Sequence, residues 1–191
     1  GDGVANEQVT YVHRSFKGVS HFIFFIRAVV KGLQNEVILS ADNSFGAGFF
    51  SALAAWILRK PYGIRVTGDY AWEQGVQRFN VQESMDAFQE RHYSFPVMLL
   101  RFAQKFSVKK AKLVIAPSEY LKKIIVRWGV DSAKIVVIYN AVDVLREPVS
   151  KNEARRMFNL NGKIVVSAGR LVPWKGFEML WEIMPQIKKE F

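Results

Sequence analysis

The sequence of 191 residues contains no cysteine and only three histidines. The absence of cysteine excludes disulfide bonds, thiolate metal sites and cysteine nucleophiles, and it fits a reducing compartment. The sequence also lacks clustered histidines and any Asp-x-Asp pair that would chelate a divalent ion. We therefore expect no metal site in this chain.

Long hydrophobic runs are missing as well. No window reaches the roughly 18 uninterrupted apolar residues of a membrane span. Residues 1–8 are polar and acidic, so no signal peptide is expected and a cytoplasmic protein is the default. The chain begins without methionine and ends inside a helical pattern, which predicts a fragment of a longer protein.

Acidic residues are scarce relative to basic ones. The formal net charge is +10 with a pI of about 9.9, which favours partners such as nucleic acid, anionic lipid or phosphorylated substrates. Residues 91–118 contain no aspartate or glutamate, and lysines and arginines alternate there with aromatic residues. Such a stretch either lies on an anionic membrane or packs its aromatic side chains on a sheet, and we favour packing.

Short β-branched runs alternate with helical patterns along the chain. This alternation predicts parallel βαβ units and a three-layer α/β fold. The pattern lapses around Pro148, which predicts a first domain over residues 1–142, a linker over 143–160 and the start of a second domain over 161–191. Strands are expected at 8–13, 36–40, 63–67, 113–116, 134–138 and 164–166, and helices at 20–31, 49–59, 84–112, 118–128, 152–158 and from 177 onward.

Two cations stand between the last predicted strand and the last predicted helix. Gly169 permits a turn, and Arg170 and Lys175 follow it before the helical spacing begins at Phe177. A planar guanidinium, a flexible ammonium and a helix N-terminus together suit a diphosphate. Judged by chemistry alone, solvated loop cations explain the pattern equally well.

The segment Ala168–Gly176 resembles the G-R-L-x-x-x-K-G signature of the retaining GT-B glycosyltransferases of group 1, family 4. Leu113–Lys123 and Lys134–Asp143 are similar to another strand, helix and crossover of that family, with Ala141 at a position that is usually glycine. The resemblance extends from residue 36 to the end of the chain and is strongest after residue 113.

This resemblance implies a GT-B fold, with a Rossmann-like acceptor-side domain over 1–142 that lacks its first βα unit and a truncated donor-binding domain from 161. It implies sugar transfer with retention from a nucleoside-diphosphate sugar to a glycan, lipid-linked or small-molecule hydroxyl, with no other cofactor. Gly169, Arg170 and Lys175 would bind the donor diphosphate. Because the family's paired glutamates would lie beyond Phe191, we expect this chain to be inactive alone.

Other partners follow from the same patterns. The charge is compatible with peripheral contact at the inner face of the membrane, whereas no nucleic-acid-binding signature is present. The alternative function is a basic α/β module that binds membrane or nucleic acid without catalysis.

Three further residues are candidates on the acceptor side. Asp69 follows the strand at 63–67, without the histidine that the family often places there, and the loop 68–73 would contain it. It either orients a substrate hydroxyl as a catalytic residue or caps the following turn. Gly46 and Gly48 either let backbone N–H groups approach an anion or serve a tight turn into the next helix.

Overall fold

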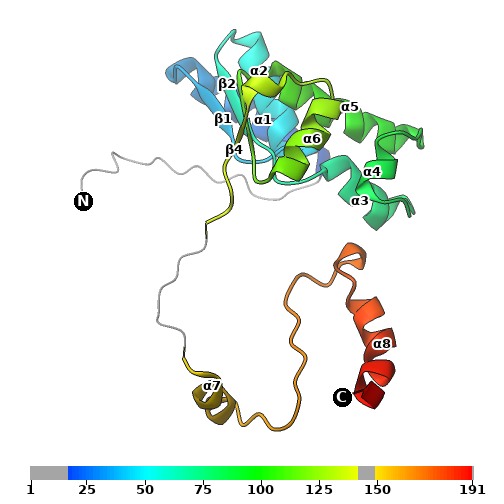
Figure 1. Ribbon diagram of the computed structural model, residues 1–191. Coiled ribbons are helices and arrows are strands. Elements are labelled where there is room, and N and C mark those ends of the chain that lie inside the picture. Colours follow the sequence, from blue (N-terminus) through cyan, green and yellow to red (C-terminus); the bar gives the residue numbers. More distant parts are fainter. Residues whose placement is uncertain (1–16, 142–148, 191) are drawn as a thin grey trace. The chain divides into compact units, whose positions relative to one another are not determined.

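The computed structural model describes residues 17–141 and 149–190 of the chain (Figure 1). The chain divides into two units, residues 1–139 and residues 140–191. The assignment of these units as acceptor-side and donor-side domains stays a prediction, as does the boundary at residue 142.

The first unit contains a four-stranded parallel sheet in the order β1-β2-β3-β4. All four predicted strands in this part of the chain are confirmed, with ends that differ by up to two residues. The predicted strand at 8–13 lies outside the described residues. The strands are β1 (Ile38–Ser40), β2 (Tyr62–Arg65), β3 (Leu113–Ala116) and β4 (Ile135–Val137).

Helices connect these strands along the first unit. Ser118 caps α6 as predicted, because its Oγ accepts from the Leu121 N–H at 3.1 Å. The break predicted near Pro96 is wider than one residue, since α4 ends at Phe88 and α5 begins at Phe95. The helices are α1 (Lys17–Gln34), the π-helical turn η1 (Phe45–Phe49), α2 (Phe50–Ile57), α3 (Tyr70–Arg78), α4 (Met85–Phe88), α5 (Phe95–Lys110), α6 (Glu119–Arg127) and the 3-10 turn η2 (Ser132–Lys134).

The loop predicted over residues 68–73 is wrong from Tyr70 onward, where α3 begins. Asp69 is the N-cap of this helix, and Glu73 places a second carboxylate in its first turn. Both features stabilise the positive end of a helix. The strand-to-helix junction is short, since only residues 66–69 separate the end of β2 at Arg65 from the start of α3 at Tyr70.

One face of the sheet carries the core. Side chains from α2, α5 and α6 pack on it, and the Trp128 ring that follows α6 is among the largest buried groups. Apolar contact of this kind is the main stabilising term in folding. The core residues of the sheet itself are Tyr62, Ile64, Val66, Val114, Ala116 and Ile135.

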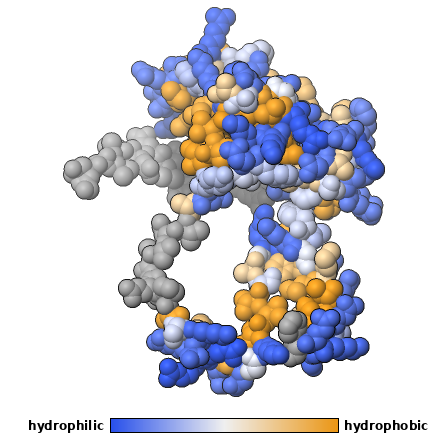
Figure 2. Space-filling model, viewed as in Figure 1, coloured by the Kyte–Doolittle hydropathy of each residue, from blue (hydrophilic) through white to orange (hydrophobic). Residues whose placement is uncertain are grey.

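The opposite face of the sheet is uncovered over the part of the chain that the structure describes. Leu39, Leu113 and Val136 on that face are 75%, 42% and 45% exposed, and Figure 2 shows an apolar area over the strands. Parallel sheets normally bury both faces. The described residues thus form two layers, where the sequence predicted three.

The interpretation that α5 packs its aromatic side chains on the sheet is only half correct. Phe106 packs against the core, whereas Phe95 and Phe102 are 80% and 61% exposed. The buried positions of α5 are taken by small apolar side chains such as Val97, Ala103 and Val108, and by the polar residues Arg101, Gln104 and Ser107.

The second unit contains α7 (Lys151–Met157), the 3-10 turn η3 (Pro173–Lys175) and α8 (Phe177–Glu190). Both predicted helices are confirmed, and Ser150 caps α7 through a 3.2 Å bond from the Glu153 N–H. The predicted strand at 164–166 is wrong, because these residues form no strand. A strand requires a neighbour for its backbone groups, and the described residues of this unit contain none.

Candidate functional site

A cleft lies at the carboxyl-terminal ends of β1 and β2. Its volume is about 160 Å³, and two loops line it, one after each strand. Ligands of open parallel sheets bind at this edge. The lining residues are Asp42, Asn43, Ser44, Thr67, Gly68, Tyr70 and Glu73.

Asn43 joins the two loops of the cleft. Its side chain is only 2% exposed. The Nδ2 group donates to the Gly68 carbonyl at 2.9 Å, and Oδ1 accepts from the Thr67 N–H at 3.3 Å. A buried amide that uses both of its ends in this way fixes the loops relative to each other.

Asp69 lies behind the cleft wall and is fully buried. Its Oδ1 accepts from the Trp72 N–H and from Gln104 Nε2, both at 3.0 Å, and its Oδ2 accepts from Gln89 Nε2 at 2.7 Å. These three donors compensate the cost of burying the carboxylate. Contacts of this kind are what the capping alternative predicts. They do not test the prediction that Asp69 orients a substrate hydroxyl.

The network continues through two glutamines. Gln104 Oε1 accepts from the Ala71 N–H at 3.1 Å and from Asn43 Nδ2 at 3.4 Å. Gln89 Oε1 accepts from the Trp128 indole N–H at 2.9 Å. A polar chain therefore connects the cleft to the core of the unit.

Sequence reasoning missed Asn43, Gln89 and Gln104. A signal for Gln104 is present, because Val97, Gln104 and Val108 fall at spacings that place them on one face of a helix. A glutamine between two valines on a buried face requires hydrogen-bond partners. No comparable signal identifies Asn43, which stands in a loop among other polar residues.

Gly46 and Gly48 lie in η1, and neither lines the cleft. A Cβ on Gly48 would come within 2.8 Å of the Asn43 Cα and the Asp42 carbonyl oxygen. A Cβ on Gly46 would meet only the His21 ring, at 3.2 Å. Gly48 thus allows η1 to pack directly on the loop after β1, which is the tight-turn alternative. The anion-binding role of both glycines stays a prediction.

The loop that contains Arg170 and Lys175 belongs to the second unit. Both side chains are exposed, and Lys175 is the last residue of η3. Gly176 follows with a φ of 69°, a left-handed conformation that favours glycine, and α8 begins at the next residue. The predicted order of two cations followed by a helix N-terminus is confirmed.

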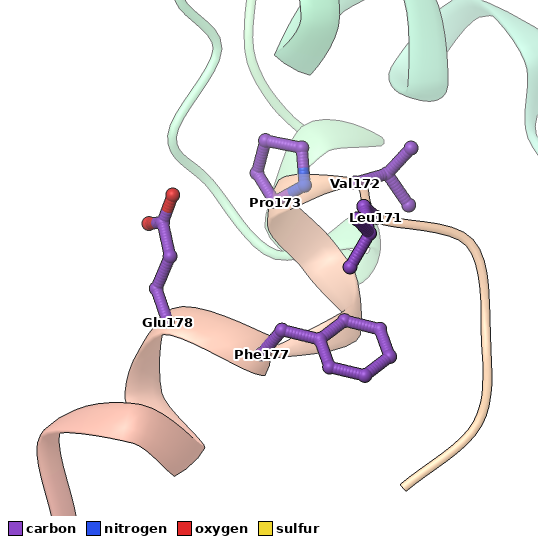
Figure 3. A pocket seen from close by; sticks show the side chains of 5 residues that line it. All are labelled: Leu171, Val172, Pro173, Phe177 and Glu178. Atoms are coloured by element: carbon purple, nitrogen blue, oxygen red, sulfur yellow. The ribbon is translucent and has the colours of Figure 1, made fainter.

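A small pocket of about 170 Å³ lies beside this loop (Figure 3). Leu171, Val172, Pro173, Phe177 and Glu178 line it. Neither Arg170 nor Lys175 contributes to its lining. A Cβ atom added to Gly169 would lie 3.5 Å from the Phe177 ring, which is an ordinary van der Waals distance.

Within residues 17–141 and 149–190, no group of three or more histidine, cysteine, aspartate or glutamate side chains is placed to hold a metal ion. No helix in those ranges combines the length and the apolar character that crossing a bilayer requires.

Comparison with known sequences decides the family. The sequence model described as Glycosyltransferase Family 4 matches residues 4–146. The chain belongs to glycosyltransferase family 4. No curated protein sequence matches the chain.

Solved structures of Anabaena Alr3699/HepE share the fold of this family 4 chain. The complex with UDP-glucose has a TM-score of 0.60 at 22% identity, over 85% of this chain and 40% of that one. The complex with UDP and glucose has a TM-score of 0.61 at 21% identity, over 92% and 43%. The chain thus spans less than half of these relatives. The prediction of a partial, Rossmann-like GT-B fold is confirmed.

Proposed function

We propose that this chain is part of a retaining glycosyltransferase, which transfers a sugar from a nucleoside diphosphate to an acceptor hydroxyl. The bond between the anomeric carbon and the diphosphate oxygen breaks, a bond from that carbon to the acceptor oxygen forms, and the acceptor hydroxyl gives its proton to the departing diphosphate. Family membership supports a glycosyltransferase, and the HepE structures contain UDP or UDP-glucose. The first unit would bind the acceptor and the second unit would begin the donor domain.

The observation that carries this proposal is the loop of Arg170 and Lys175 before α8. Negative charge grows on the diphosphate as it departs, so fixed positive groups lower the barrier most in the transition state. Both cations are exposed, and the N–H groups at the start of α8 add partial positive charge. Gly169 has no side chain, so none covers the backbone directly before Arg170.

On the acceptor side, we assign the cleft after β1 and β2 to the acceptor. Asp69 acts there as a positioning residue, because its contacts hold the start of α3 and the wall formed by Gly68 and Tyr70. Gly48 acts in the same way by letting η1 pack against the loop of Asn43. Gly46 lies in the same turn, η1, and would contribute only its backbone groups to the acceptor side.

The test is substitution in the complete enzyme. Arg170→Ala and Lys175→Ala should each lower kcat by about 100-fold, by analogy with the loss of one oxyanion donor. Lys189→Ala, in the last turn of α8, is the matched control and should leave turnover within about twofold. Unchanged kcat and KM in both loop variants would rule out the diphosphate role.

The 191-residue chain itself should show no transfer, since it spans only 40% to 43% of the HepE structures that it matches. Sugar-nucleotide turnover by the isolated chain would contradict this expectation. Turnover is measured as release of nucleoside diphosphate in the presence of candidate acceptors.

A basic, non-catalytic module that binds membrane or nucleic acid is the second candidate. The exposed Phe95 and Phe102 on α5 favour the membrane form of this candidate, because they leave apolar side chains next to lysines. Contact with the inner face of a membrane is compatible with transfer to a lipid-linked acceptor. Nucleic-acid binding has no such observation in its favour.

A further inference from the structure

A second pocket of the first unit lies at the opposite edge of the sheet from the acceptor cleft. It is formed where α2 and α5 end and where β2 begins. Its volume is about 280 Å³. The lining residues are Ala52, Ala55, Trp56, Arg59, Lys60, Tyr62 and Lys110.

The charge of this pocket is entirely positive. Arg59, Lys60 and Lys110 contribute three cations, and no carboxylate is among the lining residues. Over the described part of the chain, the ion pairs engage Arg91 and Arg127 and none of these three. A concave site with a guanidinium fork and two ammonium groups attracts phosphate oxygens.

Arg59 stands where a glycine would be expected. Its φ is 55°, in the left-handed region that ends many helices. The bonds from Lys60 N–H to the Ala55 carbonyl at 2.9 Å and from Arg59 N–H to the Trp56 carbonyl at 3.3 Å close this helix end. A bulky side chain is unfavourable there, and arginine in this place puts a charge at the mouth of the pocket.

An aromatic ridge, defined as Phe102, Phe106 and Trp56, borders the pocket. The Phe102 and Phe106 ring centroids are 6.2 Å apart, and those of Phe106 and Trp56 are 6.4 Å apart. The Lys110 ammonium lies 4.9 Å from the Trp56 ring centroid, a cation–π contact. Trp56 is nevertheless 57% exposed, and Phe102 is 61% exposed.

We propose that this pocket binds the phosphate of an anionic phospholipid headgroup. The three cations hold the phosphate, and the aromatic ridge enters the interface beside it, where tryptophan is favoured. The exposed ridge is the reason for choosing a lipid over a free phosphate, which would leave Trp56 and Phe102 in water. The site is separate from the proposed transfer reaction and does not depend on it.

Co-sedimentation with vesicles tests the proposal on the 191-residue chain. The probe is phosphatidylcholine mixed with phosphatidylglycerol at low salt. Each cation near an anionic surface contributes about 1 kcal/mol, or about fivefold in affinity, so the triple variant Arg59→Ala/Lys60→Ala/Lys110→Ala should bind about 100-fold more weakly.

The matched control removes the same charges elsewhere on the first unit. Arg78→Ala/Lys123→Ala/Lys134→Ala should bind within about threefold of the parent chain. Circular dichroism is the check that both triple variants are folded. Equal weakening of the two would mean that only net charge matters, and it would overturn the proposal.

A second arm identifies the source of the phosphate. Trp56→Ser retains all three cations and should weaken vesicle binding by about tenfold. Inorganic phosphate and glycerol phosphate should show no saturable binding by titration calorimetry. If these soluble phosphates bind and Trp56→Ser binds vesicles like the parent, the pocket takes a free phosphate and the lipid assignment is wrong.

Discussion

Gln104 donates through Nε2 to Asp69 Oδ1 at 3.0 Å while its Oε1 accepts from the Ala71 N–H at 3.1 Å. One buried amide therefore satisfies both the carboxylate that caps α3 and a backbone group in the first turn of that helix. The side chain comes from α5, which follows α3 by many residues along the chain. The start of α3 is consequently fixed by tertiary contacts as well as by its own cap.

The first prediction is that Gln104→Leu destabilises the first unit. Leucine has a similar volume but leaves the Ala71 N–H unpaired and removes one donor from a buried charge. The free energy of unfolding should fall by about 2–3 kcal/mol. Urea denaturation followed by circular dichroism measures it. Gln77→Leu on the exposed side of α3 is the control and should change stability by less than about 0.5 kcal/mol.

The second prediction compares two neighbouring glycines of η1. Gly48→Ala would force a methyl group within 2.8 Å of backbone atoms of the loop after β1, which cannot move away as a side chain can. It should cost about 1–3 kcal/mol. Gly46→Ala meets only the His21 ring and should cost less than about 1 kcal/mol. Equal thermal stability of the two variants would show that the close approach of η1 is not required.

The third prediction concerns alkaline pH. Burial raises the pKa of the Tyr62 phenol well above its ordinary value, and its hydroxyl donates to the Gly48 carbonyl at 3.1 Å. The raised pKa means that only the unfolded state ionises just above pH 10. Stability is therefore unaffected by this group below about pH 10 and declines as the pH rises further.

Tyr62→Phe should remove this part of the alkaline decline. Below pH 10 the variant should be less stable by about 1 kcal/mol, since the Gly48 carbonyl loses its donor. Above pH 10 the free energy of unfolding should decline more slowly in the variant than in the parent, and the two slopes should differ by about 1.4 kcal/mol per pH unit. The reason is that the variant lacks the one tyrosine that ionises in the unfolded state and stays protonated in the folded state. Parallel curves of stability against pH for the two proteins would contradict the assignment.

Local patterns predicted much of the fold. The β-branched run at Leu113–Ala116 and the cap at Ser118 correspond to the observed β3 and α6, because both signals act within a few residues. The order of strands and helices sufficed to predict a parallel α/β sheet. The cations of the signature loop were placed before a helix for the same reason.

The failures share a physical cause, which is dependence on distant partners. Ile164 and its neighbours have strand propensity, but a strand forms only beside another strand. Asn43 and Gln104 are 61 residues apart in sequence and meet through a 3.4 Å hydrogen bond. Phe102 looked like a core residue by spacing, and only the packing of α5 shows that it is exposed.

The last prediction separates stability from binding at Arg59. Its φ of 55° penalises any side chain, so Arg59→Gly should raise the free energy of unfolding by about 0.5–1 kcal/mol while weakening vesicle binding by about fivefold. Asn80→Gly is the control, since Asn80 also has a positive φ, of 53°, but lies outside the pocket. Asn80→Gly should raise the free energy of unfolding by less than Arg59→Gly does, because asparagine tolerates this conformation better than arginine. The Asn80→Gly variant should also bind vesicles like the parent chain. Loss of stability in Arg59→Gly would mean that the arginine side chain holds the fold together, and the strain at this position would then have no connection with a ligand.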